Sequence, residues 1–156
     1  MTEAKDIVRE VRIDAPPEDV FPFFTDPDKM IVWKAIEATL DPRPGGIFRI
    51  NVTGRDVARG EYLEIDPPPR VVFTFGWESP RSPERPGSTT VEITLAPDGE
   101  GTLVRLVHSG VPDETRAGSA GGWDHYLARL AVAAEGGNPG PDPWAEAANA
   151  KEGRSD

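Results

Sequence analysis

One long segment near the end of the chain, residues 113–136, has the periodicity of an amphipathic α-helix. Trp123, Leu127, Leu130 and Ala134 follow one another at intervals of three or four residues, so they share one face of such a helix. A helix of this length must bury its apolar face against another element. Because the chain contains no other long helical pattern, we expect that element to be a β-sheet.

Most of the chain before this helix alternates between apolar and polar residues, which is the pattern of half-buried β-strands. Short turns rich in proline and glycine separate the strands, and tight connections of this kind favour antiparallel pairing. Two short helical patterns, at residues 18–24 and 25–33, follow the first strand. We therefore predict an α+β fold in which an antiparallel sheet of about seven strands packs on the long helix. The expected strands are residues 7–13, 36–40, 47–52, 57–65, 71–77, 91–95 and 102–108.

Length and residue pattern indicate one folded domain followed by a tail. A chain of 156 residues suits a single domain with a substantial core, which we assign to residues 1–136. Residues 137–156 are rich in proline, glycine and alanine, and we expect them to be flexible, with Trp144 as a candidate anchor. Within the domain, the proline-rich segment 79–88 is expected to be an exposed loop.

The composition argues against several classes of partner. The chain carries 27 Asp and Glu against 17 Lys and Arg, a net charge of −10, and it has no basic run. Phosphate-rich partners require clustered basic residues, so we expect binding to neither nucleic acid nor membranes. The absence of cysteine excludes disulfides and Cys-ligated metals. Because no apolar run has membrane-spanning length and the N-terminus has no apolar targeting segment, we expect a cytoplasmic protein.

Seven short motifs occur in a characteristic order along residues 6–136. They are IDAPPEDVF from Ile13, TDP from Thr25 with Trp33 after it, PGGIFR from Pro44, GEYLEIDPP from Gly60, VVFTF from Val71, GTLVRLVHSG from Gly101 and GWDHYLARL from Gly122. In this order they resemble the activator homologues of the heat-shock protein 90 ATPase, a family of the START/SRPBCC superfamily with many bacterial members. The resemblance implies a helix-grip fold, in which a curved antiparallel sheet wraps around the C-terminal helix and leaves a cavity between them.

Members of this family include co-chaperone domains, lipid and polyketide binders and cyclases, so the resemblance does not select one activity. One departure concerns the position after Trp33, where the family often carries a second tryptophan and this chain has Lys34.

The implied cavity would be lined by the inward-facing side chains of the strands and the long helix. An apolar cavity with a few polar groups suits a hydrophobic or aromatic small molecule. The alternative is that most of these side chains simply fill the core, as aromatic residues usually do. We place Trp33 at the mouth of the cavity. The candidate ligand-binding residues are Trp33, Phe48, Tyr62, Phe73, Phe75, Trp77, Leu106, His108, Trp123 and Leu127.

Two titratable side chains are candidates for acid–base chemistry. His108 ends an apolar strand face and could act as an acid, a base or a ligand anchor, although a structural role with a backbone carbonyl or carboxylate partner is the more common use. Glu64 shares the strand parity of Tyr62, which would make it a buried carboxylate with a raised pKa unless Arg9 or Arg49 pairs with it. Structural pairing is the interpretation we favour for Glu64, and we assign no catalytic residue.

The remaining features suggest neither a metal nor a cofactor. His125 should point away from Trp123 and lie in solvent, and neither histidine has an acidic residue at ligand spacing. No glycine-rich phosphate loop joins a strand to a helix. The pair Gly121–Gly122 is instead expected to let the long helix approach the sheet closely.

Three functions remain open at this point. The leading hypothesis is a binding protein that holds a hydrophobic or aromatic small molecule between the sheet and the helix. The second is a cyclase-like or hydrolase-like enzyme that uses His108 or Glu64 in the same cavity. The third is a co-chaperone that binds a protein partner through its outer surface. In each case we expect a monomer or a homodimer.

Overall fold

The computed structural model, which describes residues 6–153, confirms the predicted α+β fold. Seven strands form one antiparallel sheet in the order β1-β7-β6-β5-β4-β3-β2. The first strand therefore pairs with the last, and every other pair of neighbours is consecutive in the sequence. The strands are β1 Ile7–Ile13, β2 Glu37–Leu40, β3 Ile47–Asn51, β4 Val57–Asp66, β5 Arg70–Phe75, β6 Thr89–Asp98 and β7 Gly101–Ser109.

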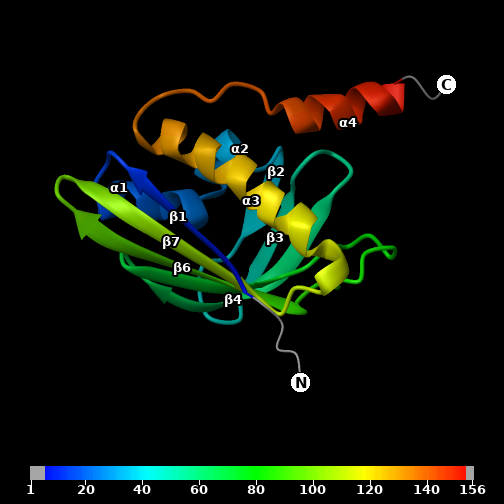
Figure 1. Ribbon diagram of the computed structural model, residues 1–156, viewed down its shortest axis with the longest axis horizontal. Coiled ribbons are helices and arrows are strands. Elements are labelled where there is room, and N and C mark those ends of the chain that lie inside the picture. Colours follow the sequence, from blue (N-terminus) through cyan, green and yellow to red (C-terminus); the bar gives the residue numbers. More distant parts are fainter. Residues whose placement is uncertain (1–5, 154–156) are drawn as a thin grey trace.

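The long helix α3, Asp113–Ala134, lies across one face of this sheet (Figure 1). Between β1 and β2 the chain forms α1 (Pro17–Val20), a 3₁₀ turn η1 (Phe21–Phe24) and α2 (Pro27–Trp33). These short helices match the two predicted after the first strand, and proline opens each of α1 and α2 as it commonly does. No helix within residues 6–153 is long and apolar enough to cross a membrane.

The apolar face of α3 packs on the sheet as its periodicity predicts. Trp123, Leu127 and Leu130 are buried, and Leu130 is fully inaccessible. Burying one such leucine contributes about 1.5–3 kcal/mol to folding. Helix packing therefore rests on these few large side chains, whereas the first half of α3 presents small residues to the sheet.

The inner face of the sheet carries a cluster of aromatic rings. Phe48 of β3 stacks on Phe73 of β5 with ring centroids 4.1 Å apart, and Tyr62 of β4 meets both rings edge-on. The Tyr62 hydroxyl donates a hydrogen bond to the backbone oxygen of Phe24 at 2.8 Å, which ties η1 to the sheet. This end of the interior is a packed core.

An irregularity in β4 overturns the expected burial of Glu64. The pairing of β4 with β5 shifts register between Tyr62 and Glu64, which marks a β-bulge and reverses the alternation of side chains beyond it. Tyr62 is buried, but Glu64 is exposed and pairs with Arg70, whose Nε lies 2.9 Å from its carboxylate. Neither Arg9 nor Arg49 pairs with it, since Arg9 binds Asp124 and Arg49 binds Glu78.

The chain after α3 contains a helix that the sequence analysis does not predict. It turns back and forms α4, Pro143–Gly153, beside α3 (Figure 1). Trp144, the candidate anchor, stacks on the His125 ring with centroids 4.0 Å apart. His125, which we predicted to lie in solvent, is instead mostly buried between α3 and the start of α4.

Candidate functional site

A cavity of about 580 Å³ lies between α3 and the sheet. One wall is α3, and the opposite wall comes from β5, β7 and the loop between β3 and β4. The segment that follows β5, through Ser79 and Pro83, forms a third side. The cavity adjoins the packed aromatic cluster of Phe48, Tyr62 and Phe73, and the Phe75 ring separates the two.

Small residues on α3 create this space. Thr115, Gly118, Ser119 and Gly122 line the cavity and recur at helical spacing along one face of α3. A Cβ atom built on Gly118 or Gly122 would have no heavy atom within 4 Å. The expectation that Gly121–Gly122 allows close approach to the sheet is therefore wrong. The glycines leave a gap, and the helix is held further along by its larger residues.

The C-terminal end of α2 is fastened to α3 by Arg129. Its guanidinium donates to the backbone oxygen of Trp33 at 3.0 Å and also reaches that of Gly140 at 2.8 Å. Lys34, the next residue after α2, is thereby held close to α3 and extends its side chain into the cavity wall.

Lys34 is a buried cation surrounded by aromatic rings. Its side chain is 6% exposed, and its Nζ lies 4.3 Å from the ring centroid of Tyr126 and 4.5 Å from that of Trp123. The Phe75 ring centroid is 6.0 Å away. Burial lowers the pKa of Lys34 to about 7, against the smaller opposing effects of Asp142 and Glu84. Among residues 6–153 no carboxylate forms an ion pair with it.

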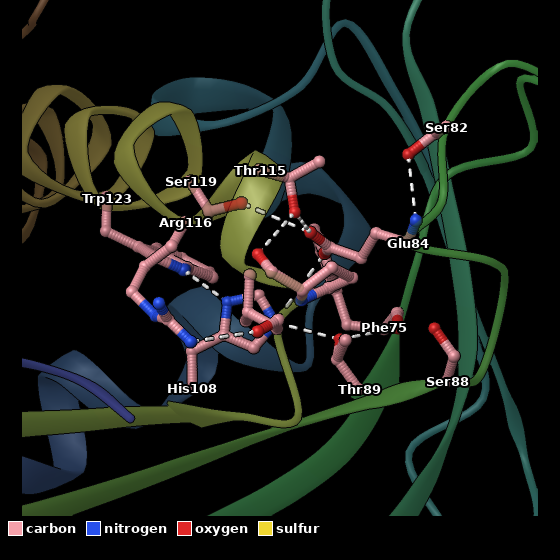
Figure 2. A network of polar contacts seen from close by, with 12 residues as sticks. Phe75, Ser82, Glu84, Ser88, Thr89, His108, Thr115, Arg116, Ser119 and Trp123 are labelled. Atoms are coloured by element: carbon pink, nitrogen blue, oxygen red, sulfur yellow. Dashed lines mark hydrogen bonds and ion pairs between the residues drawn. The ribbon is translucent and has the colours of Figure 1, made fainter. Parts of the chain in front are cut away.

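His108 of β7 is fully buried, and its two ring nitrogens contact Trp123 and Thr89 (Figure 2). The indole Nε1 of Trp123 donates to His108 Nδ1 at 3.0 Å. Because an indole can only donate, Nδ1 is unprotonated and Nε2 carries the hydrogen. Nε2 lies 2.8 Å from the hydroxyl of Thr89, which itself donates to the backbone oxygen of Phe75 at 2.7 Å. Burial, followed by the charge of Lys34, lowers the pKa of His108 to about 4, so the ring is neutral near pH 7.

Glu84 is a second buried titratable group, and it lies behind the cavity wall. Its Oε1 accepts hydrogen bonds from the hydroxyls of Ser119 at 3.2 Å and Thr115 at 3.5 Å, as Figure 2 shows. Its Oε2 has no hydrogen-bond partner and lies 3.7 Å from His108 Nε2. Burial raises the pKa of Glu84, although the two hydroxyls and Lys34 act in the opposite direction. The carboxyl group links the segment after β5 to α3.

This position of Glu84 differs from the sequence-based expectation. Residues 79–88 were predicted to form an exposed loop, but Glu84 within that stretch is 0% exposed. No periodicity distinguishes one glutamate in a proline-rich segment, so nothing in the local sequence could have identified it. Its burial depends on α3, which lies some thirty residues further along.

Asp142, just before α4, closes one side of the site. Tyr126 donates its hydroxyl hydrogen to Asp142 at 2.6 Å, and His125 Nε2 lies 2.8 Å from the same carboxylate. Burial acts to raise the pKa of Asp142, but the hydrogen bonds from Tyr126 and His125 outweigh it, and the pKa is lowered. Trp144 follows and lines the cavity with about half of its surface exposed.

The structure divides the ten predicted ligand-binding residues into two groups. Four line the cavity, namely Phe75, Trp77, His108 and Trp123. The other six lie in the core away from it, namely Trp33, Phe48, Tyr62, Phe73, Leu106 and Leu127. Trp33 is not at the mouth of the cavity. It is 1% exposed, and its indole donates to the backbone oxygen of Phe23 at 3.0 Å.

Several residues of the site escaped the sequence analysis. One signal was available for Lys34. In the family that the chain resembles, the position after Trp33 often carries a second tryptophan, and this chain has a lysine there. Tyr126 lies three residues after Trp123 on α3, so helical spacing could have placed it on the same face of the helix. Asp142 had no such signal, because it follows the domain in a segment without a regular pattern, and Trp144 was predicted only as an anchor of the tail. Among residues 6–153 no group of three or more His, Asp or Glu side chains is arranged to hold a metal ion.

Comparison with known proteins gives a consistent result. The family described as activator of Hsp90 ATPase homolog 1-like protein matches residues 14–135. An AHSA1-like protein of Rhizobium etli is 46% identical and superposes with a TM-score of 0.73, over 92% of this chain and 90% of that one. No curated protein matches the chain significantly.

Two further solved structures share the fold. CalU16 of Micromonospora echinospora is 28% identical, with a TM-score of 0.70 over 85% of this chain and 78% of its own. The Aha1 protein of Colwellia psychrerythraea, solved as a dimer, is 21% identical, with a TM-score of 0.74 over 85% of this chain and 98% of that one. At this identity the last comparison bears on the fold alone.

Proposed function

The chain belongs to the family of activator of Hsp90 ATPase homolog 1-like proteins, and from that premise we propose that it binds a small, largely apolar molecule in the cavity between the sheet and α3. The single observation that carries this proposal is the cavity itself. Its volume of about 580 Å³ lies within the range of small-molecule sites. A protein selected only for stability would be expected to fill such a space, since interiors are close-packed.

The chemistry of the walls supports an aromatic or hydrophobic ligand. Rings of Phe75, Trp77, Trp123 and Tyr126 face the space, and rings of this kind bind apolar molecules through large contact areas. The hydroxyls of Thr115 and Ser119 add polar groups along α3. A few polar groups in an apolar surround is the usual composition of ligand pockets.

Binding has more support than acid–base catalysis at this site. Both ring nitrogens of His108 are engaged inside the protein, with Trp123 on one side and Thr89 on the other. The His108 ring is also neutral in the protein without a ligand. Glu64, the other candidate acid, lies on the outer face of the sheet and cannot reach the cavity. The enzyme hypothesis therefore loses the two groups on which it depended.

The proposal is tested by filling the cavity. Gly122→Leu places a side chain into the cavity, and Gly121→Leu is a matched control because Gly121 is its neighbour on α3 but does not line the cavity. The neutral fluorescent probe N-phenylnaphthylamine is titrated into each protein. We expect the wild type and Gly121→Leu to bind it with similar affinity and Gly122→Leu to bind it at least about tenfold more weakly.

Two results would contradict the proposal. One is a wild-type protein that fails to bind the probe, and the other is equal binding by Gly122→Leu, which would place the probe elsewhere. Native mass spectrometry after exposure to a cell extract gives an independent reading. A discrete adduct on the wild type and on Gly121→Leu that is missing from Gly122→Leu would report the natural ligand.

A further inference from the structure

We propose that the ligand of this cavity carries an anionic group and that Lys34 binds it. This inference rests on the proposed function and specifies the class of molecule, namely an aromatic or apolar acid. It follows from the placement of one buried ammonium group and from the state of every polar group around it.

Within residues 6–148 no oxygen atom accepts a hydrogen bond from the three N–H groups of the Lys34 ammonium. It faces the rings of Tyr126, Trp123 and Phe75, which attract a cation through their π faces but offer no oxygen atom. A buried charge is normally paired, because its transfer out of water is costly. Lys34 is only 6% exposed, so its charge is largely removed from bulk water.

The neighbouring acids form no ion pair with Lys34, although Glu84 Oε2 has no hydrogen-bond partner of its own. Asp142 accepts from Tyr126, His125 and the backbone N–H of Trp144, and none of its oxygens lies within ion-pair distance of Lys34. Glu84 accepts from Ser119 and Thr115 behind the wall. Both influence Lys34 only through space. The internal acids therefore leave its donors available to a molecule in the cavity.

The other groups facing Lys34 supply no competing cation, and within residues 6–148 none of them accepts a hydrogen bond from it. His108 is neutral, and both of its nitrogens are engaged. The Tyr126 hydroxyl donates to Asp142. The three rings resemble an aromatic cage for a cationic ligand, but the chain's own ammonium already occupies that position. The electrostatics of this wall thus favour an anionic ligand group.

Charges near the opening would not hold an anion equally well. Arg81 lines the cavity but is exposed to solvent, whereas Asp56 and Glu114 line it as well and repel an anion. A charge pair at an exposed position contributes little, but a pair shielded from water contributes more. An acidic ligand would therefore be oriented with its charge towards Lys34 and its apolar body along Trp77 and α3.

Two probes with the same ring system separate this inference from the proposed function. Anilinonaphthalene sulfonate is the anionic counterpart of neutral N-phenylnaphthylamine. In Lys34→Met we expect the affinity for the sulfonate to fall about tenfold to hundredfold, the usual value of a hydrogen-bonded charge. The affinity for the neutral probe should change by less than about threefold. Arg81→Met is the matched control, because it removes a cation at the opening and should leave sulfonate binding within the same threefold margin.

The pH dependence gives a second readout. In the free protein the pKa of Lys34 is about 7, so its charge is lost as the pH rises above neutrality. Bound sulfonate favours the protonated amine, and binding therefore takes up a proton. Wild-type affinity for the sulfonate should fall by up to about tenfold per pH unit between pH 8 and pH 9. Affinity for the neutral probe should stay constant, as should the sulfonate affinity of Lys34→Met.

The outcomes are distinguishable. If the neutral probe binds in the cavity but sulfonate binding does not depend on Lys34, this inference is wrong and the proposed function stands. If Arg81→Met weakens sulfonate binding as much as Lys34→Met does, the anion sits at the opening and the inference is again overturned. If neither probe binds the wild type, the proposed function fails and this inference fails with it. Competition between the two probes ensures that both report the same cavity.

Discussion

Replacing Lys34 with methionine should stabilise the unliganded protein, and the gain should depend on pH. Burial lowers the pKa of this amine from 10.5 to about 7. Each pKa unit corresponds to about 1.4 kcal/mol, so the shift costs the folded state as much as about 5 kcal/mol at pH 7. Methionine keeps an unbranched stem of similar length and suits the contact with three rings, without a charge to desolvate.

The sign of the pH effect follows from the two states. The unfolded chain keeps Lys34 protonated up to about pH 10.5, whereas the folded protein releases the proton near pH 7. Between these values the unfolded state binds more protons, so wild-type stability rises with pH. Methionine does not titrate. The advantage of Lys34→Met should therefore shrink by about 2–3 kcal/mol between pH 7 and pH 9.

Urea unfolding followed by tryptophan fluorescence measures both quantities across this pH range. Lys29→Met is the control, because Lys29 lies on α2 over the Phe23 ring at 5.0 Å but is only partly buried. It should change the free energy of unfolding by less than about 0.5 kcal/mol. If Lys34→Met is less stable than the wild type at pH 7, or if its advantage does not vary with pH, the reasoning about the buried amine is refuted.

Three further predictions concern Glu84 and two glycines. Because burial raises the pKa of Glu84, the unfolded state releases this proton first, and wild-type stability should fall as the pH rises above about 4.5. The glutamine in Glu84→Gln cannot titrate, so the stability of this variant relative to the wild type should improve between pH 4.5 and pH 7 in the same unfolding assay. A difference in stability that stays constant over this range would mean that Glu84 is not buried as described. Gly60→Ala should destabilise the protein by about 3 kcal/mol, since its Cβ would lie 1.9 Å from the backbone oxygen of Thr74. Gly121→Ala, whose Cβ meets no atom within 4 Å, should instead raise the melting temperature by an amount equivalent to about 0.5–1 kcal/mol, and a loss of stability there would contradict the open geometry of α3.

Much of the fold could be predicted from the sequence because its signals are local. The periodicity of Trp123, Leu127 and Leu130 depends only on spacing along one helix, and these residues are buried as expected. The alternation of the strands likewise predicts which side chains face the core. It fails at Glu64, where one bulge shifts the register and places the carboxylate on the outer face.

The candidate site was predicted less completely. Phe75, Trp77, His108 and Trp123 line the cavity, but Phe48, Phe73 and Leu106 have the same strand patterns and belong to the packed core. An inward-facing side chain meets either a neighbour or a cavity, and the sequence does not distinguish these cases. What distinguishes them is the opposite element, since α3 presents leucines at one end and glycines at the other.

The class of fold, the position of the long helix, most strand boundaries and the family could all be predicted from the amino-acid order. These depend on periodicity and motif order, which are properties of short stretches. The burial of Lys34 and Glu84 beside a cavity could be recognised only in the folded chain. The burial of a charge is set by what packs around it, and here those neighbours come from α3, β5 and the segment before α4, all distant in the sequence from Lys34.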